Sequence, residues 1–420
     1  MEITEKKNRA IENSNTDQLE KLLEIKNLKA YFYTEEGIVK AVDGVSFDIY
    51  SDEVLGLVGE TGCGKSVTAL SILQLVGEPG KIIDGSIMFN DINLLELSAK
   101  DMRNYRGNQI TMIFQDPLNS LNPVLSVGKQ ISEVFFLHQK EKLKKIVDNR
   151  RLERKKLIDE RKNLKDELRK KKKDGRISED EMKSLQLSIN ELKDKIPKAP
   201  QLKSIALEEV EKVIEEVGIA DAKGILKRYP HELSGGMRQR VMISMALSCN
   251  PLLLIADEPT TALDVTIQAQ ILDLMKILKN KFKTSILLIT HDLGIIAETC
   301  DRIAVMYSGN IVEYATARDL FKNPRHPYTK GLIAAIPSIK TKNKKLETIR
   351  GMVPNLIYPP SGCRFHPRCD DRLEICDKIK PFWTKIGEKY YIACHLYDPK
   401  YKDSPKYEWK KQEDAESYKV

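Results

Sequence analysis

Apolar residues along this chain fall into short runs that predict buried strands separated by helical stretches. The runs occur at Val54–Val58, Ile110–Phe114, Leu252–Ala256 and Ser285–Thr290. Each run is long enough for a strand and too short for a helix, and helical stretches lie between them. This alternation is typical of an α/β fold built on a mostly parallel sheet.

A second pattern, alternating apolar and polar positions, predicts antiparallel strands near the beginning of the chain. It extends over Leu23–Asp48 and is broken by a turn at Thr34–Gly37. A short strand at Ile87–Phe89 follows later, and a strand–turn–strand unit at Arg302–Ala315 closes the unit of alternating strands and helices. We therefore expect an antiparallel β subdomain beside the parallel sheet.

Residues 138–205 differ in composition and interrupt the strand pattern. They are rich in Lys, Arg, Glu and Leu, and a turn is expected at Asp174–Gly175. Apolar residues recur there at heptad spacing, as Met182, Leu185, Ile189, Leu192 and Ile196, with a weaker series at Leu157, Leu164 and Leu168. We predict an inserted, coiled-coil-like helical hairpin. Its surface is either solvated, or docks on a protein, or contacts nucleic acid or anionic lipid.

Charge is concentrated in the same segment. Residues 139–205 hold 23 Lys and Arg against 13 Asp and Glu, a surplus of ten, whereas the whole chain carries +8. The remainder is therefore near neutral at −2, so the composition does not indicate a general nucleic-acid-binding surface.

Length and composition restrict the remaining possibilities. A chain of 420 residues, 41% of them hydrophobic, is large enough for two or three domains. It contains no apolar run of ~18 residues, and its first residues are polar, so we expect a cytoplasmic protein. Seven cysteines favour reduced thiols or metal ligands over a disulfide framework.

The stretch GETGCGKS lies between the first buried strand and a helix predicted over Ser66–Leu75, and it has the spacing of a P-loop. Its glycines allow the backbone to wrap around a polyphosphate, Lys65 can reach the β- and γ-phosphates, and Ser66 can ligate Mg²⁺. The expected nucleotide contacts in this stretch are Gly59, Glu60, Thr61, Gly62, Cys63, Gly64, Lys65, Ser66 and Val67.

Polar residues follow other predicted strands and complete a hydrolytic site. Asp257 and Glu258 end one strand, His291 follows the next, and Gln115 follows a third. Strand ends of a parallel sheet share one edge, where ligands bind. Ser66, Asp257 and Gln115 are expected to hold Mg²⁺, and Glu258 to accept a proton from the attacking water.

In order and spacing, these motifs resemble the ATP-binding-cassette (ABC) ATPases over about Leu23–Ala315. The motifs and residues that carry this resemblance are GETGCGKS, Gln115, LSGGMRQR, LLLIADEP, TALD and His291. The resemblance implies an ABC nucleotide-binding-domain fold, in which Ser234, Gly235 and Gly236 cap the γ-phosphate of ATP on a partner's P-loop. It assigns communication across that dimer to Asp264. It places an adenine-stacking ring at Phe32, a role that Tyr31 or Tyr33 could fill instead.

Further motifs are similar to the ATP-binding subunits of oligopeptide and dipeptide importers. They include IFQDPLNSLNP, ADEPTTALDVTIQAQIL, RHPYTKGL and GCRFHPRC. The resemblance implies a peripheral ATPase on the cytoplasmic face of the membrane. Its expected partners are a second homologous ATPase in a heterodimer, two permease subunits and, through the complex, an extracellular peptide-binding protein. The alternative is a soluble ABC ATPase acting on nucleic acid or the ribosome; direct nucleic-acid binding is not expected.

Four cysteines gather near the C-terminal end, separated by 5, 6 and 17 residues: Cys363, Cys369, Cys376 and Cys394. The spacing matches no standard zinc or iron–sulfur pattern, so reduced structural thiols and a bound metal both remain open. Resemblance to those peptide-importer ATPases that carry a [4Fe–4S] cluster favours a cluster, with Zn²⁺ as the alternative because His366 and His395 are close in sequence.

The predicted organisation has four parts. A disordered tail covers residues 1–20, and the ABC ATPase domain covers 21–322 with the hairpin at 138–205 in its helical subdomain. A small cysteine-containing C-terminal domain of the peptide-importer type covers 323–397, and a polar tail covers 398–420.

Overall fold

The structure, a computed structural model, describes residues 20–115, 120–175, 177–261, 263–336 and 349–401. Two compact units divide the chain. One consists of Met1–Asp116 with Asn250–Val420, and the other is Pro117–Cys249. Of the two predicted tails, residues 1–19 and 402–420 lie outside the described residues.

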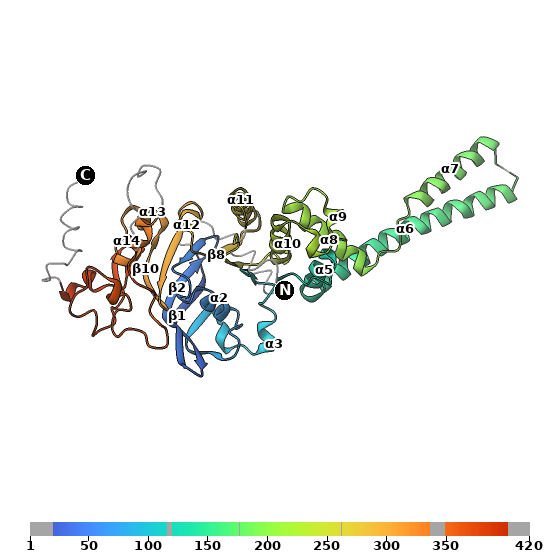
Figure 1. Cartoon of the computed structure of the whole chain (residues 1–420). Helices are drawn as coiled ribbons and strands as arrows, with labels where there is room; N and C mark the ends of the chain where they lie inside the picture. Colours follow the sequence, from blue (N-terminus) through green and yellow to red (C-terminus); the bar gives the residue numbers. More distant parts are fainter. Residues whose placement is uncertain (1–19, 116–119, 176, 262, 337–348, 402–420) are drawn as a thin grey trace. The chain divides into compact units, whose positions relative to one another are not determined.

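The first unit contains a sheet in the order β11-β12-β10-β9-β3-β8-β7-β6 (Figure 1). From β9 to β6 the neighbouring strands are parallel, and the strands beyond β9 are antiparallel. The bounds are β3 Val54–Val58, β6 Ile110–Ile113, β7 Leu253–Asp257, β8 Ser285–Thr290, β9 Arg302–Tyr307, β10 Asn310–Thr316, β11 Thr384–Gly387 and β12 Tyr390–Ile392. The β6 strand ends one residue earlier than predicted, and Phe114 is exposed.

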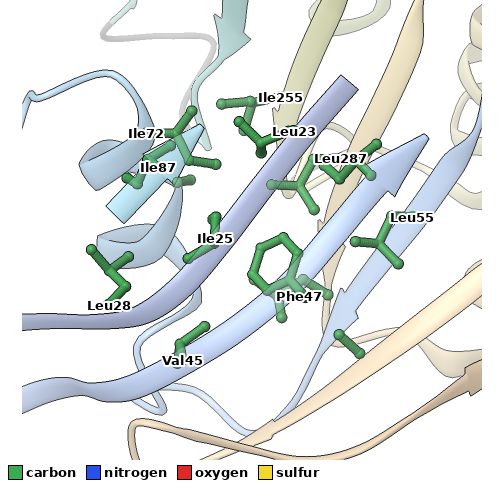
Figure 2. Close-up of a cluster of buried hydrophobic side chains, with 14 of the residues drawn as sticks. Leu23, Ile25, Leu28, Val45, Phe47, Leu55, Ile72, Ile87, Ile255 and Leu287 are labelled. Atoms are coloured by element: carbon green, nitrogen blue, oxygen red, sulfur yellow. The ribbon is translucent and has the colours of Figure 1, made fainter. Parts of the chain in front are cut away.

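The second sheet of this unit is antiparallel and has the order β2-β1-β4-β5. Its strands are β1 Lys21–Thr34, β2 Gly37–Tyr50, β4 Gly80–Phe89 and β5 Ile92–Asn93. Apolar side chains from both sheets and from the helix α2 (Lys65–Ile72) form one buried cluster (Figure 2). Leu23 and Phe47 contribute from β1 and β2, and Ile255 and Leu287 from β7 and β8. This cluster anchors the strand and helix that flank the P-loop.

The remaining helices of the first unit are short, apart from α11. They are α3 Ala99–Met102, α11 Val265–Phe282, α12 Leu293–Thr299, α13 Ala317–Lys322 and α14 Pro327–Ala334. The α2 helix ends at Ile72 rather than at the predicted Leu75. The helix ends there because Arg106, which lies outside it, donates hydrogen bonds to the carbonyl oxygens of Leu73 and Gln74.

The second unit is helical, with bounds α5 Val127–His138, α6 Lys140–Lys173, α7 Glu179–Lys195, α8 Leu202–Glu216, α9 Ala222–Ile225 and α10 Gly235–Leu247. Helices α6 and α7 lie side by side within it (Figure 1). The residues of the predicted heptad series are the least exposed along α7 and its C-cap. Ile189 is buried, and the other four are partly buried: Met182, Leu185, Leu192 and Ile196. The other side chains of α7 are exposed. The α8 helix starts at Leu202, so its first turn falls inside the segment 138–205.

Beyond residue 322, the described part of the chain joins the first unit. The β12 strand pairs with β10 and so extends the eight-stranded sheet. The predicted boundary between residues 322 and 323 therefore falls within one compact unit, and a separate C-terminal domain stays a prediction. None of the helices in the described ranges has the length and apolar character needed to cross a bilayer.

Candidate nucleotide-binding site

The predicted P-loop, Gly59–Ser66, joins the fully buried strand β3 to helix α2. Gly62 and Gly64 have φ angles of 81° and 104°, which residues with side chains rarely adopt. A Cβ on Gly64 would lie 2.2 Å from the carbonyl oxygen of Ala41. Glycine at these positions therefore allows the loop to curve tightly against neighbouring backbone.

Lys65 is the first residue of α2 and only 6% exposed. Its Nζ lies 2.8 Å from the carbonyl oxygen of Gly59 and 3.2 Å from that of Glu60, so it spans the mouth of the loop. The α2 N-terminus has a glycine, Gly64, at its N-cap and thus no capping side chain. Its backbone N–H groups can therefore bind an anion.

Asp257 ends β7 beside the P-loop and is 4% exposed. Its Oδ1 has no hydrogen-bond partner among the described residues. Burial raises the pKa of Asp257, and a hydrogen bond with Ser66 only partly offsets this effect. An orphaned carboxylate oxygen next to a hydroxyl is a suitable ligand pair for Mg²⁺.

Glu258 follows Asp257 and is held by three side chains. Its Oε2 accepts hydrogen bonds from Gln115 Nε2 at 2.9 Å and from Thr261 Oγ1 at 3.0 Å. Its Oε1 lies 3.1 Å from Nδ1 of His291. The structure therefore brings together Gln115, Glu258 and His291, which the sequence placed at the ends of three different strands.

The local backbone also directs Glu258 into this position. Its φ is 47°, unusual for a residue with a side chain, and its N–H donates to the carbonyl oxygen of Ile289 on β8. Burial alone would raise the pKa of Glu258. The hydrogen bonds from His291 and Thr261 outweigh burial and lower it, so the carboxylate is ionised at neutral pH.

Three neighbouring rings on β1 were predicted as candidates for adenine stacking. Phe32 is partly buried and packs at Gly80, whereas Tyr33 is 46% exposed. The Tyr31 hydroxyl donates to Asp43 Oδ1 at 2.7 Å. Successive strand residues point to opposite faces, so Phe32 points away from Tyr31 and Tyr33. The choice among the three stays open.

The expected signature residues belong to the second unit and begin α10. Ser234 is its N-cap and accepts a hydrogen bond from the N–H of Met237, while Gly235 and Gly236 form the first turn. Ser234 and Gly235 are exposed, so this helix terminus is open to solvent. In the first unit, Asp264 is exposed and caps α11 through the N–H of Ile267. Ala262 of TALD lies outside the described residues.

Sequence reasoning missed two residues that touch the P-loop. The Tyr328 hydroxyl accepts a hydrogen bond from the N–H of Glu60 at 2.9 Å. Arg368 forms a two-pronged ion pair with the Glu60 carboxylate, with N–O distances of 2.7 and 3.0 Å. Both lie in motifs noted above, RHPYTKGL and GCRFHPRC. Both motifs support the resemblance noted above, but no local pattern in either of them predicts a contact with Glu60.

The four C-terminal cysteines form no disulfide in the described part of the chain, and they line one small cavity of about 10 Å³ together with His366 and His395. Burial raises the pKa of Cys363 to about 11 and that of Cys369 to about 12. Among the described residues, no group of three or more His, Cys, Asp or Glu side chains is arranged to hold a metal ion. The donors suit a soft metal, but they are not arranged as a metal site here, so the [4Fe–4S] cluster and its zinc alternative stay predictions.

Comparison with known families decides what this site belongs to. The family model described as "ABC transporter" matches residues 42–261, which is more than half of the chain. The chain belongs to the ABC transporter family. As a member of its ATP-binding proteins it is an ATPase whose hydrolysis of ATP powers transport. A second model, "Oligopeptide/dipeptide transporter, C-terminal region", matches residues 312–376.

Three relatives of the chain are named as ATP-binding proteins of oligopeptide or dipeptide transport. It is 45% identical to the oligopeptide transport ATP-binding protein AppD of Bacillus subtilis, over 90% of this chain and 97% of that protein. It is 42% identical to the dipeptide transport ATP-binding protein DppD of the same organism, over 90% and 96%. For OppD of Salmonella typhimurium, the identity is 41%, over 86% and 89%.

A solved structure supports the fold independently of these names. It is a dimeric ATP-binding cassette in a post-hydrolysis state bound to ADP and Pi. The TM-score is 0.50 at 20% identity, and the match covers 71% of this chain and 99% of that one. At this identity the likeness concerns the fold alone. The predicted ABC nucleotide-binding-domain fold is confirmed.

Proposed function

We propose that this chain drives the uptake of oligopeptides or dipeptides by hydrolysing ATP at the cytoplasmic face of a membrane. One observation carries the proposal. A complete hydrolytic site coexists with a C-terminal region of the oligopeptide/dipeptide transporter type. Relatives that share both regions over 90% of the chain are named for oligopeptide and dipeptide transport.

The residues around Asp257 fit a Mg²⁺ ion. Asp257 offers an oxygen without a partner among the described residues, Ser66 offers a hydroxyl, and Gln115 keeps its amide oxygen while its Nε2 donates to Glu258. We assign these three residues to the metal. Bound Mg²⁺ would neutralise charge on the β- and γ-phosphates.

Glu258 acts as the general base in this proposal. It is ionised at neutral pH and accepts a proton at its carboxylate from the water that attacks the γ-phosphate. His291 directs Nδ1 toward Glu258, and we assign its Nε2 to the γ-phosphate, a contact in which Nε2 donates only when both ring nitrogens carry a proton. Lys65 and the N–H groups of α2 bind the phosphates and stabilise their charge.

The chain is proposed to work with partners. It carries one P-loop and one signature motif, and Ser234 at the exposed start of α10 would cap ATP on a second, homologous ATPase subunit. Asp264 would communicate across this heterodimer. Two permease subunits would form the channel, and an extracellular binding protein would deliver peptide. Gln115 and the loop after it, of which residues 116–119 are not described, would link the site to the permease.

Reconstitution with the transport complex tests this function. Purification from detergent-solubilised membranes should recover the chain with integral-membrane subunits and a second ATPase. In proteoliposomes, ATP turnover should rise when a peptide-loaded binding protein is added. Purification with ribosomes or nucleic acid, and turnover that ignores peptide delivery, would instead support the alternative of a soluble ABC ATPase.

We also propose that Cys363, Cys369, Cys376 and Cys394 bind a soft metal, a [4Fe–4S] cluster or Zn²⁺. The support is that four thiols line one cavity, since clustered thiolates favour these metals. Anaerobic purification followed by elemental analysis separates the cases. Stoichiometric iron with a visible absorption band indicates the cluster, zinc indicates the alternative, and neither metal leaves four structural thiols.

A further inference from the structure

Two arginines, one beside each terminal cysteine, connect the segment Cys363–Cys369 to the P-loop. Arg368 does so directly, and Arg364 does so through the turn at Ser308 and Gly309. Arg368 precedes Cys369 and grips the carboxylate of Glu60 with both terminal nitrogens. Its own side chain is 6% exposed, so this pair is largely desolvated on the arginine side. Bidentate pairs of this kind fix geometry as well as charge.

Arg364 follows Cys363 and reaches the other side of the loop. Its guanidinium donates to the carbonyl oxygen of Ser308 and pairs with Asp43 at 2.6 Å. Gly309, the residue after Ser308, donates its N–H to the carbonyl oxygen of Cys63 in the P-loop at 2.8 Å. Arg364 therefore supports the turn that holds the P-loop backbone.

An aromatic cluster ties the same segment to the backbone of Glu60 in the loop. The Phe365 ring lies 5.1 Å from that of Tyr307 and 5.4 Å from that of Tyr328. Tyr328 accepts the N–H of Glu60, and Arg368 lies 5.7 Å from the centre of the Tyr307 ring. Phe365 also lines the cysteine cavity. Side-chain packing therefore runs without a break from the thiols to the phosphate-binding loop.

We propose that the segment Cys363–Cys369 is a clamp that positions the P-loop for ATP, with Arg368 as its main positioning residue. The clamp couples the nucleotide site to the cysteine cavity. Binding of MgATP therefore stabilises the segment, and the segment in turn stabilises the bound nucleotide, because such coupling acts equally in both directions.

The first experiment is a double-mutant cycle on the affinity for MgATP. Arg368→Gln and Glu60→Gln should each raise the Kd about tenfold, and the double variant should be no weaker than either single variant. Arg368→Lys should recover part of the lost affinity, because lysine keeps the positive charge but cannot form the two-pronged pair with Glu60. For Arg368→Gln the kcat at saturating ATP should change less than twofold, and Arg372→Gln, at an exposed arginine just beyond the segment, should bind normally.

The second experiment reads the coupling itself. Hydrogen exchange of residues 363–369 should slow several-fold when MgATP is added to a Glu258→Gln protein, which retains nucleotide. The slowing should disappear when Arg368→Gln is added to this background. Unchanged Kd in Arg368→Gln, additive losses in the cycle, or exchange of the segment that ignores ATP would each overturn the clamp. A folding defect would be recognised from a lowered unfolding midpoint.

Discussion

Glu258 is the side chain on which the proposed hydrolysis depends. Its two carboxylate oxygens receive Gln115, Thr261 and His291 from three different parts of the chain. These bonds fix its direction and keep it ionised. General-base catalysis by a residue held in this way contributes typically ~10²–10⁴-fold.

We therefore expect Glu258→Gln to lower kcat for ATP hydrolysis at least ~100-fold while the Kd for MgATP stays within a few-fold. The amide keeps the shape, but it offers a single acceptor oxygen and cannot take the proton. Steady-state turnover and equilibrium binding measure the two effects. Glu298→Gln, at an exposed glutamate on α12, is the matched control and should behave as the unmodified chain. Intact turnover in Glu258→Gln would mean that another group is the base.

The pH dependence of turnover should report the bond between His291 and Glu258. Because the pKa of Glu258 is lowered, kcat is expected to hold as pH falls through the ordinary range of glutamate and to drop only below it. His291→Ala removes a bond to the ionised form, so the acid limb should move to higher pH. The measurement is the pH at which kcat falls on the acid side of the profile, rather than the value of kcat itself. An unmoved limb would show that this bond does not set the pKa.

At the scale of strands and helices, a site residue could be predicted from the sequence when it follows a strand, but not when its contacts depend on loops. Asp257, His291 and Gln115 were predictable because parallel strands end at one edge of a sheet. Thr261 and Arg368 were not, since their contacts depend on the path of loops. Arg368 and Glu60 lie 308 residues apart, and no local pattern reports such a pairing. The α2 helix was predicted too long because the tertiary contacts of Arg106 end it.

The two helices of the segment 138–205 offer a test at the same scale. Ile189 on α7 is 7% exposed, whereas Leu187 is 63% exposed. Ile189→Asp buries a charge between α6 and α7 and should speed hydrogen exchange of α7 amides at least ~10-fold. Leu187→Asp, the same chemistry on the open face, should leave exchange unchanged. Equal effects of both substitutions would contradict packing of α7 through this seam.

At the scale of the whole molecule, the open question is which chain completes the ATP site. Lys65→Ala disables the P-loop, and Ser234→Arg blocks the signature with a large charged side chain. If the chain pairs with a homologous ATPase, a mixture of these two variants should stay inactive without that subunit. Recovery of a substantial part of the unmodified turnover in the mixture would show that two copies of this chain form the site. Turnover against mixing ratio is the readout.

The order of strands in the eight-stranded sheet also has a consequence for biosynthesis. The P-loop strand β3 ends at Val58, yet its two neighbours, β8 and β9, end at Thr290 and Tyr307. A nascent chain emerging from the ribosome therefore exposes the loop long before the strands that seat it have been translated. ATP bound at the P-loop therefore cannot guide the early stages of folding. Nascent chains that stop short of β9 should depend on chaperones, and not on their own bound nucleotide, to avoid aggregation.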